Sequence, residues 1–306
     1  MTQHKQFKTY AEQVALLRGR GMSFRDPADA ETLLSSLNYY RLSAYWHPMR
    51  HFDQDSRAAL DRFKGGTTFE LVVDLYEFDE RLRHCVFVEL DRVETAMRSM
   101  LGYELGRIDP QIHLKPKKLG ALASSKRKNN RTVYEVWIRK YNTALESSKE
   151  DFVTHHKQKY GGTLPIWAAV ELLDWGMLSH LFAMSPNIAR NRVAHRCDLN
   201  GPQLASWLKS LNIVRNYAAH HARMFNRAYD IKPKLNDDPS LVAARSSMNR
   251  VFGQLSLIQY LHLKLGLSSG QSFPRLLEGY PDNALVPFRV LGAPEQWRTL
   301  ALWQAS

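Results

Sequence analysis

Cysteine is scarce in this 306-residue chain, which has only Cys85 and Cys197, far apart in the sequence. Two distant cysteines argue against a disulfide framework and against a cysteine-based zinc site. No apolar run reaches the ~20 residues that a membrane-spanning helix needs, and the N-terminal segment lacks the apolar stretch of a signal peptide. We therefore expect a soluble, cytoplasmic protein that does not cross a membrane.

Acidic residues are also in short supply. The chain has 30 Asp and Glu against 42 Lys and Arg, a formal charge of +12. Such a surplus attracts polyanions, so nucleic acid is the first partner to consider and an anionic membrane surface the second. A basic but merely solvated surface is the other interpretation. No basic amphipathic helix with an aromatic apolar face favours the membrane.

Several signatures of catalysis are missing. We find no Gly-rich phosphate loop, no Ser or Cys nucleophile signature and no pair of carboxylates at catalytic spacing. The adjacent His155 and His156 would point apart on a helix, so a metal shared between them is not expected. The sequence gives no reason to expect a cofactor or a metal.

The hydrophobic pattern is helical almost throughout and predicts an all-α fold. From Phe69 to Leu105 there is no proline and apolar residues recur at helical spacing, which predicts one long helix with Thr67 and Thr68 before it. Other periodic runs are 31–41, 166–184, 204–227 and 248–265. No clean alternation predicts a strand.

We divide the chain into an N-terminal helical region (1–66), a helical core (67–267) and an irregular C-terminal tail (268–306) with a short final helix at 297–303. Residues 111–132 interrupt the core with a basic stretch poor in apolar residues. Either this is a mobile insertion that RNA orders, or it is a solvated loop. The basic residues assigned to RNA binding there are Lys117, Lys118, Lys126, Arg127, Lys128 and Arg131.

Another candidate RNA contact lies in the N-terminal region. The run from Asn38 to Arg41 mixes aromatic and basic side chains, which can stack on bases and bind phosphate. We assign Arg41 to RNA binding. The competing interpretation is the edge of a hydrophobic core with an arginine whose head group reaches the solvent.

The sequence Arg215-Asn-Tyr-Ala-Ala-His220 carries the strongest chemical signal. On a helix extending to residue 227, Asn216, His220, Arg223 and Arg227 would form one polar stripe, and Arg215 could swing toward it. The neighbouring His221 would lie on the apolar stripe instead. We therefore treat His221 as structural and assign Arg223 and Arg227 to RNA binding.

This group of side chains suits cleavage of RNA by its own 2′-hydroxyl. A histidine can take or give the proton, an arginine fork can bind the negatively charged phosphorane, and an asparagine can orient either. No metal is needed, but two proton-transfer groups are. A two-fold dimer that joins two copies of the motif would supply both. The competing interpretation is an ordinary surface pair on a helix.

The chain resembles the Abi-like proteins of bacterial phage defence, the AbiD/AbiF group. The matching segments follow the family order over roughly residues 10–265: 37–43 with Tyr45, 63–69, 75–83, 93–99, 164–167, Glu171, 175–179, 206–208, and 214–223 with Asn226 and Arg227. So many ordered matches are more specific than any one motif.

The resemblance implies a HEPN-like helical bundle with an N-terminal helical extension and a basic inter-helix insertion. The HEPN hallmark is an arginine and a histidine separated by four to six residues, with a polar residue, often asparagine, directly after the arginine. Arg215, Asn216 and His220 match it. HEPN ribonucleases typically cut RNA without metal as dimers or paired domains. The group is also associated with a structured non-coding RNA partner.

Two functions therefore remain open from the sequence. One is an endoribonuclease of an abortive-infection or toxin–antitoxin system, with Arg215 and His220 catalytic and Asn216 positioning. The other is a non-catalytic RNA-binding module that sequesters an RNA or scaffolds a defence complex. The intact motif favours the first.

Overall fold

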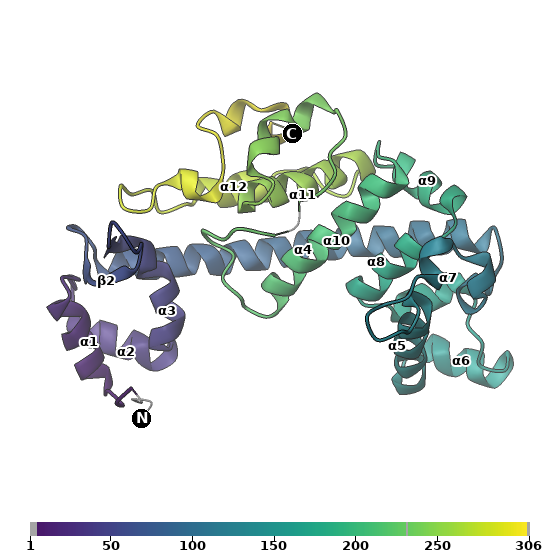
Figure 1. Ribbon diagram of the computed structural model, residues 1–306, viewed down its shortest axis with the longest axis horizontal. Helices are drawn as coiled ribbons and strands as arrows, with labels where there is room; N and C mark the ends of the chain where they lie inside the picture. Colours follow the sequence, from purple (N-terminus) through teal and green to yellow (C-terminus); the bar gives the residue numbers. More distant parts are fainter. Residues whose placement is uncertain (1–4, 231, 305–306) are drawn as a thin grey trace.

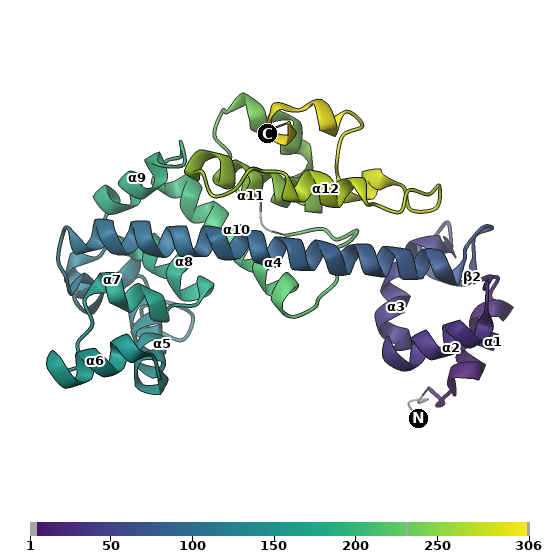
Figure 2. The same ribbon diagram turned by 180° about the vertical axis from the view of Figure 1, so that it is seen from behind.

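The computed structural model describes residues 5–230 and 232–304. Helices dominate this part of the chain, and its one sheet has two strands, which confirms the all-α prediction. The molecule is elongated along a single helix, α4, with a group of short helices at each end (Figures 1 and 2). No helix among the described residues has the length and apolar character to cross a lipid bilayer.

Helix α4 spans Phe69–Gly106, which confirms the predicted long helix. Its 38 residues correspond to about 57 Å at 1.5 Å per residue. The Thr68 hydroxyl caps it by accepting a hydrogen bond from the Leu71 N–H at 3.0 Å. Apolar residues along the whole helix are buried, so α4 forms the scaffold on which the other elements pack.

The N-terminal end of α4 carries three short helices and the two-stranded sheet. These are α1 (Tyr10–Gly19), α2 (Pro27–Ser36), α3 (Tyr39–Trp46), β1 (Arg50–Phe52) and β2 (Ala59–Phe63). The single helix expected over 31–41 is wrong. The chain breaks at Leu37, and the Asn38 side chain starts α3 by accepting a hydrogen bond from the Tyr40 N–H at 2.9 Å. The antiparallel pair β1–β2 was not predicted.

The opposite end of α4 carries the basic insertion and five helices. The helices are α5 (Val133–Ser147), α6 (Asp151–Lys159), α7 (Ile166–Ala169), α8 (Trp175–Met184) and α9 (Asn187–His195). The insertion forms short 3-10 turns at Ile112–Leu114, Pro116–Lys118 and Ala121–Ser124. Its Gly120 N–H donates to the Met184 carbonyl at 2.6 Å, which joins it to the end of α8.

Helix α10 (Gly201–Ala219) crosses α4 near its middle (Figures 1 and 2). The C-terminal helices α11 (Val251–Leu265) and α12 (Ser272–Glu278) lie along α4. The segment 268–304 is largely packed rather than a loose tail, because Leu291, Trp297 and Trp303 are all buried. The short helix expected at 297–303 consists of two 3-10 turns, Trp297–Thr299 and Ala301–Trp303.

Candidate functional site

The Arg-Asn-x-x-x-His motif lies at the C-terminal end of α10. Arg215 and Asn216 are in the last turns of the helix, and His220 is the first residue after it. The helix expected to continue to Arg227 ends at Ala219, so this part of the prediction is wrong. Arg223 and Arg227 therefore do not extend a helical stripe with Asn216 and His220.

A backbone turn of the Schellman type closes α10. The Ala222 N–H donates to the Tyr217 carbonyl at 2.9 Å, and the His221 N–H donates to the Ala218 carbonyl at 3.4 Å. His221 occupies the left-handed position of this turn, with φ 54°, where glycine is the usual residue. Its side chain is exposed, so the expected place on the apolar stripe is also wrong.

A buried carboxylate holds the segment that follows the turn. Asp79, on α4, accepts hydrogen bonds from the backbone N–H groups of Met224 at 3.1 Å and Phe225 at 2.6 Å. The Tyr45 hydroxyl donates to it at 2.6 Å, and the buried Arg83 forms an ion pair with it. All four partners are donors, which is what an ionised carboxyl group requires when it is buried.

Helix α3 makes two further hydrogen bonds to the same segment. Arg41 donates from Nη1 to the His221 carbonyl at 3.3 Å, and Arg223 donates to the Ala44 carbonyl at 2.7 Å. Arg227 stacks over the Tyr217 ring, with its Cζ 4.1 Å from the centroid. The structure thus brings Arg41 next to the motif. Arg223 and Arg227 already make contacts within the protein, with the Ala44 carbonyl and the Tyr217 ring.

The three motif side chains differ in their surroundings. Asn216 and His220 are exposed, whereas Arg215 is half-buried with its Cζ 5.6 Å from the centroid of Phe87 on α4. Across residues 5–230 and 232–304, no carboxylate forms an ion pair with Arg215, so its charge remains available for an anion. Arg215 still acts at longer range on Glu94. Burial raises the pKa of Glu94, while Arg98 and then Arg215 oppose that rise.

A cavity of about 340 Å³ opens between α4 and the end of α10. Helix α4 lines it with Glu80, Arg83, His84 and Phe87, and the other side has Ala218, Ala219 and His221. Sequence reasoning did not select Glu80 or His84. The sequence feature that could have indicated them is the i, i+4, i+7 spacing of Glu80, His84 and Phe87, which places all three on one face of the predicted long helix. The cavity lies beside the motif and is at the small end of the range for ligand sites, about 300–1,000 Å³.

The first half of the basic insertion is less available for RNA than its sequence suggests. Lys115 and Lys118 both form ion pairs with Asp109, at 2.7 and 2.6 Å. The hydrogen bond from Lys115, followed by that from Lys118, holds the pKa of Asp109 well below its usual range. His113 is fully buried. Two lysines of this half, Lys117 and Lys118, were assigned to RNA binding. Both are exposed, but only Lys117 has no ion pair among the described residues.

The second half of the insertion is a basic turn on the surface. Lys126, Arg127, Lys128 and Arg131 are all exposed. The Arg127 N–H donates to the Arg131 carbonyl at 2.8 Å, which closes the turn, and the Arg127 side chain approaches His180 of α8 at 3.4 Å. This turn precedes α5, at the end of α4 opposite to α1–α3 (Figure 1). The structure does not bring these four residues to the motif.

Within the described ranges, no group of three or more His, Cys, Asp or Glu residues has the arrangement of a metal site.

The fold and the site define a helical protein with a cationic, histidine-containing motif at a helix end. Comparison with protein families assigns the chain to a family. The family model described as Abi-like protein matches residues 32–226, more than half of the chain. The chain therefore belongs to the Abi-like family, which connects it with abortive infection, a form of phage defence. No curated protein and no solved structure matches it significantly.

The family match includes all the elements that build the site. It spans α3, with Arg41 and Tyr45, the whole of α4, with Asp79, and α10 with the turn that follows it. Asp79, which was not selected from the sequence, joins these elements through its contacts with Tyr45, Arg83 and residues 224–225. The turn after the motif is thus fixed by residues from three separate parts of the matched region.

Proposed function

We propose that the protein is a metal-independent endoribonuclease of phage defence, with Arg215, Asn216 and His220 at its active site. In the proposed reaction the ribose 2′-oxygen attacks the adjacent phosphorus. The O2′–P bond forms and the P–O5′ bond breaks, which leaves a 2′,3′-cyclic phosphate and a free 5′-hydroxyl. One group removes the 2′-hydroxyl proton, and another gives a proton to the leaving 5′-oxygen.

One observation carries the proposal more than any other. An exposed histidine and an arginine without an ion pair among the described residues lie at the end of one helix, beside a cavity. Arg215 matches the negative charge of the phosphorane, Asn216 can orient the phosphate, and His220 can transfer the proton. The buried Asp79–Arg83 pair supports the turn, which limits how far His220 can move.

The second proton-transfer group is assigned to a second copy of the chain. A homodimer that joined two helix ends would place two His220 side chains at one phosphate, one as base and one as acid. His84, in the cavity of the same chain, is the competing source. A comparison of variants at these two histidines distinguishes the sources.

RNA is proposed as the substrate and also as a regulator. The charge of +12 and the exposed basic turn Lys126–Arg131 favour binding of a structured RNA at the α5 end of the molecule. Such an RNA could hold the nuclease in check until infection. The basic turn lies away from the motif, so a regulatory RNA and a substrate strand could be bound together.

Expression in bacteria tests the proposal. The wild-type chain should slow growth, whereas His220→Ala should not, and both proteins should retain the same co-purifying RNA. The retention of RNA serves as the control for folding and binding. Equal growth inhibition by both proteins would contradict the catalytic assignment. Tight retention of one defined RNA with no growth inhibition by either would favour the non-catalytic RNA-binding module.

A further inference from the structure

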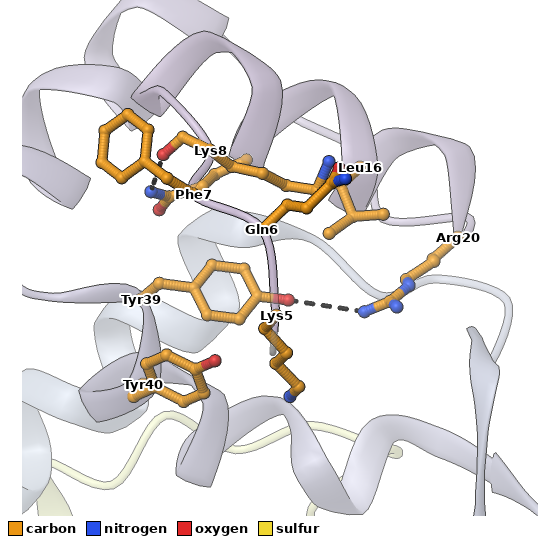
Figure 3. A pocket seen from close by; sticks show the side chains of 9 residues that line it. Lys5, Gln6, Phe7, Lys8, Leu16, Arg20, Tyr39 and Tyr40 are labelled. Atoms are coloured by element: carbon orange, nitrogen blue, oxygen red, sulfur yellow. Dashed lines mark hydrogen bonds between the residues drawn. The ribbon is translucent and has the colours of Figure 1, made fainter. Parts of the chain in front are cut away.

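A second cavity lies in the N-terminal region, on the side of α3 that faces α1. Its volume is about 720 Å³, which is within the range of about 300–1,000 Å³ for small-ligand sites. The segment before α1, helix α1 itself and the start of α3 all contribute to its walls (Figure 3). The Gln13 side chain donates to the Lys8 carbonyl at 3.0 Å, which holds that first segment against α1.

The charge of this pocket is positive. Lys5, Lys8 and Arg20 line it, and none of the described residues that line it is acidic. Arg20 pairs with Asp61 at 2.8 Å, but Asp61 also pairs with Arg50, so two guanidinium groups share one carboxylate. Lys5 and Lys8 have no ion pair in the described chain. A net positive charge therefore remains for an anionic ligand.

The pocket also presents aromatic rings to the solvent. Tyr40 is 64% exposed and Phe7 89% exposed, which is unusual for side chains of this size. Tyr39 and Tyr40 lie edge to face, with ring centroids 5.6 Å apart, and Lys5 stands 5.5 Å from the centroid of Tyr40. Figure 3 shows the Tyr39 hydroxyl directed toward Arg20, from which it accepts a hydrogen bond at 3.4 Å. An open ring with cations beside it suits a planar, anionic ligand.

We propose that this pocket binds an unpaired nucleotide of RNA, with the base stacked on Tyr40 and the phosphate held by Lys5 and Lys8. Aromatic rings with adjacent cations are how proteins bind single strands. The inference deepens the proposed function and rests on its assignment of RNA as a partner. It adds a binding site that is separate from the cleavage motif.

The pocket is connected to the motif through α3. Tyr40 lines the pocket, and the next residue, Arg41, donates a hydrogen bond to the His221 carbonyl in the turn after α10. A strand held on Tyr40 would therefore be anchored on the same helix that positions this turn. The pocket lies at the α1–α3 end of α4, whereas the basic turn Lys126–Arg131 lies at the other end. The two RNA contacts are thus expected to act on different parts of an RNA.

The test measures binding of a fluorescent single-stranded RNA of about ten nucleotides by anisotropy. The full chain carries His220→Ala throughout, so that cleavage does not affect the signal. Tyr40→Ala should weaken binding about tenfold, which is the loss expected for one base–aromatic stack. Tyr40→Phe should bind like the parent because the ring is kept, and Tyr40→Leu should bind like Tyr40→Ala. Lys5→Gln should reduce the slope of the logarithm of the binding constant against the logarithm of the salt concentration by about one, because one phosphate contact is lost.

Tyr160 is the matched control. It is 57% exposed and has Lys159 5.6 Å from its ring centroid, but it lies on the far end of the molecule, after α6. Tyr160→Ala should leave binding unchanged. Equal affinities of Tyr40→Ala and its parent, or an equal loss in Tyr160→Ala, would overturn the proposal. Binding to phosphatidylserine vesicles that depends on Tyr40, with RNA affinity unchanged, would also overturn it and identify a membrane site.

The result of the Tyr40 binding test does not depend on whether the protein cleaves RNA. If Tyr40→Ala weakens binding and the wild-type chain cuts no RNA, the pocket stands and the proposed cleavage fails. If the wild-type chain cuts RNA and Tyr40→Ala binds like its parent, the pocket alone fails.

Discussion

The Oδ1 atom of Asp79, in the N-terminal third of the long helix α4, accepts a hydrogen bond of 2.6 Å from the backbone N–H of Phe225. The two residues are 146 positions apart in the sequence, and both are buried. This contact fixes the chain five residues after His220. It ties the scaffold helix to the segment that follows the motif.

Asp79→Asn should destabilise the protein by about 3–5 kcal/mol, because it leaves the buried Arg83 without its counter-charge. Urea unfolding followed by circular dichroism measures the change. Glu77→Gln is the control on the same helix, since Glu77 is exposed and pairs with Arg81 only at 3.9 Å. A loss for Asp79→Asn no larger than that for Glu77→Gln would show that the buried pair does not support the fold.

His221→Gly should keep or raise stability, by up to about 1 kcal/mol, because glycine adopts the left-handed conformation without the strain of a side chain. His221→Val should lower it. RNA cleavage by His221→Gly should remain close to that of the wild type, whereas the adjacent His220→Ala should lose it. Loss of cleavage in His221→Gly with unchanged stability would show that the second histidine takes part in the chemistry.

His84→Ala should cleave RNA at close to the wild-type rate, because the second proton-transfer group is proposed to come from a second copy of the chain. Single-turnover cleavage at saturating RNA is the measurement, with the exposed His195→Ala as a matched control. The activity per chain should also rise with protein concentration as dimers form. A fall of about 10²–10⁴-fold in His84→Ala alone would place the second group in the same chain instead.

His113 should make stability depend on pH. Burial lowers its pKa to about 4, and neither ring nitrogen has a hydrogen-bond partner in the described structure. The unfolded chain therefore takes up a proton near pH 6.5 while the folded chain does not, so stability falls as the pH drops from about 6.5 toward 4.

The variant His113→Phe removes this effect. Its loss of unfolding free energy between about pH 7 and pH 5 should be smaller than that of the wild type by about 2 kcal/mol. His155→Phe, at an exposed position, provides the comparison. The same pH dependence in His113→Phe and in the wild type would show that His113 is not the group responsible.

The sequence predicts the elements that obey one strong local signal. Helix α4 follows from an apolar repeat without proline and from the threonines before it, of which Thr68 is the cap. The run expected from residue 204 corresponds to α10, which begins three residues earlier, at Gly201. The strands β1 and β2 could not be predicted, because they are short and their exposure does not alternate as in a half-buried strand.

The end of α10 shows why the site itself was only partly predictable. No glycine or proline follows Ala219 to mark the end, and the helical pattern continues through Phe225. The turn forms because distant groups satisfy the backbone, namely Asp79 and Arg41. The sequence around Asp79 or Arg41 does not show whether the side chain faces solvent or a buried turn, so the end of α10 could not be predicted from it. Arg215, Asn216 and His220 are selected from the sequence because they form a compact motif, and their catalytic role stays a prediction.

Metal-independent cleavage by Arg215, Asn216 and His220 is measured by incubating purified, RNA-free protein with cellular RNA in EDTA and mapping the ends of the products. Cleavage should resist EDTA, leave 2′,3′-cyclic phosphate ends and fall by about 10²–10⁴-fold in His220→Ala. Cleavage that persists in His220→Ala, or that EDTA abolishes, would contradict the proposed function.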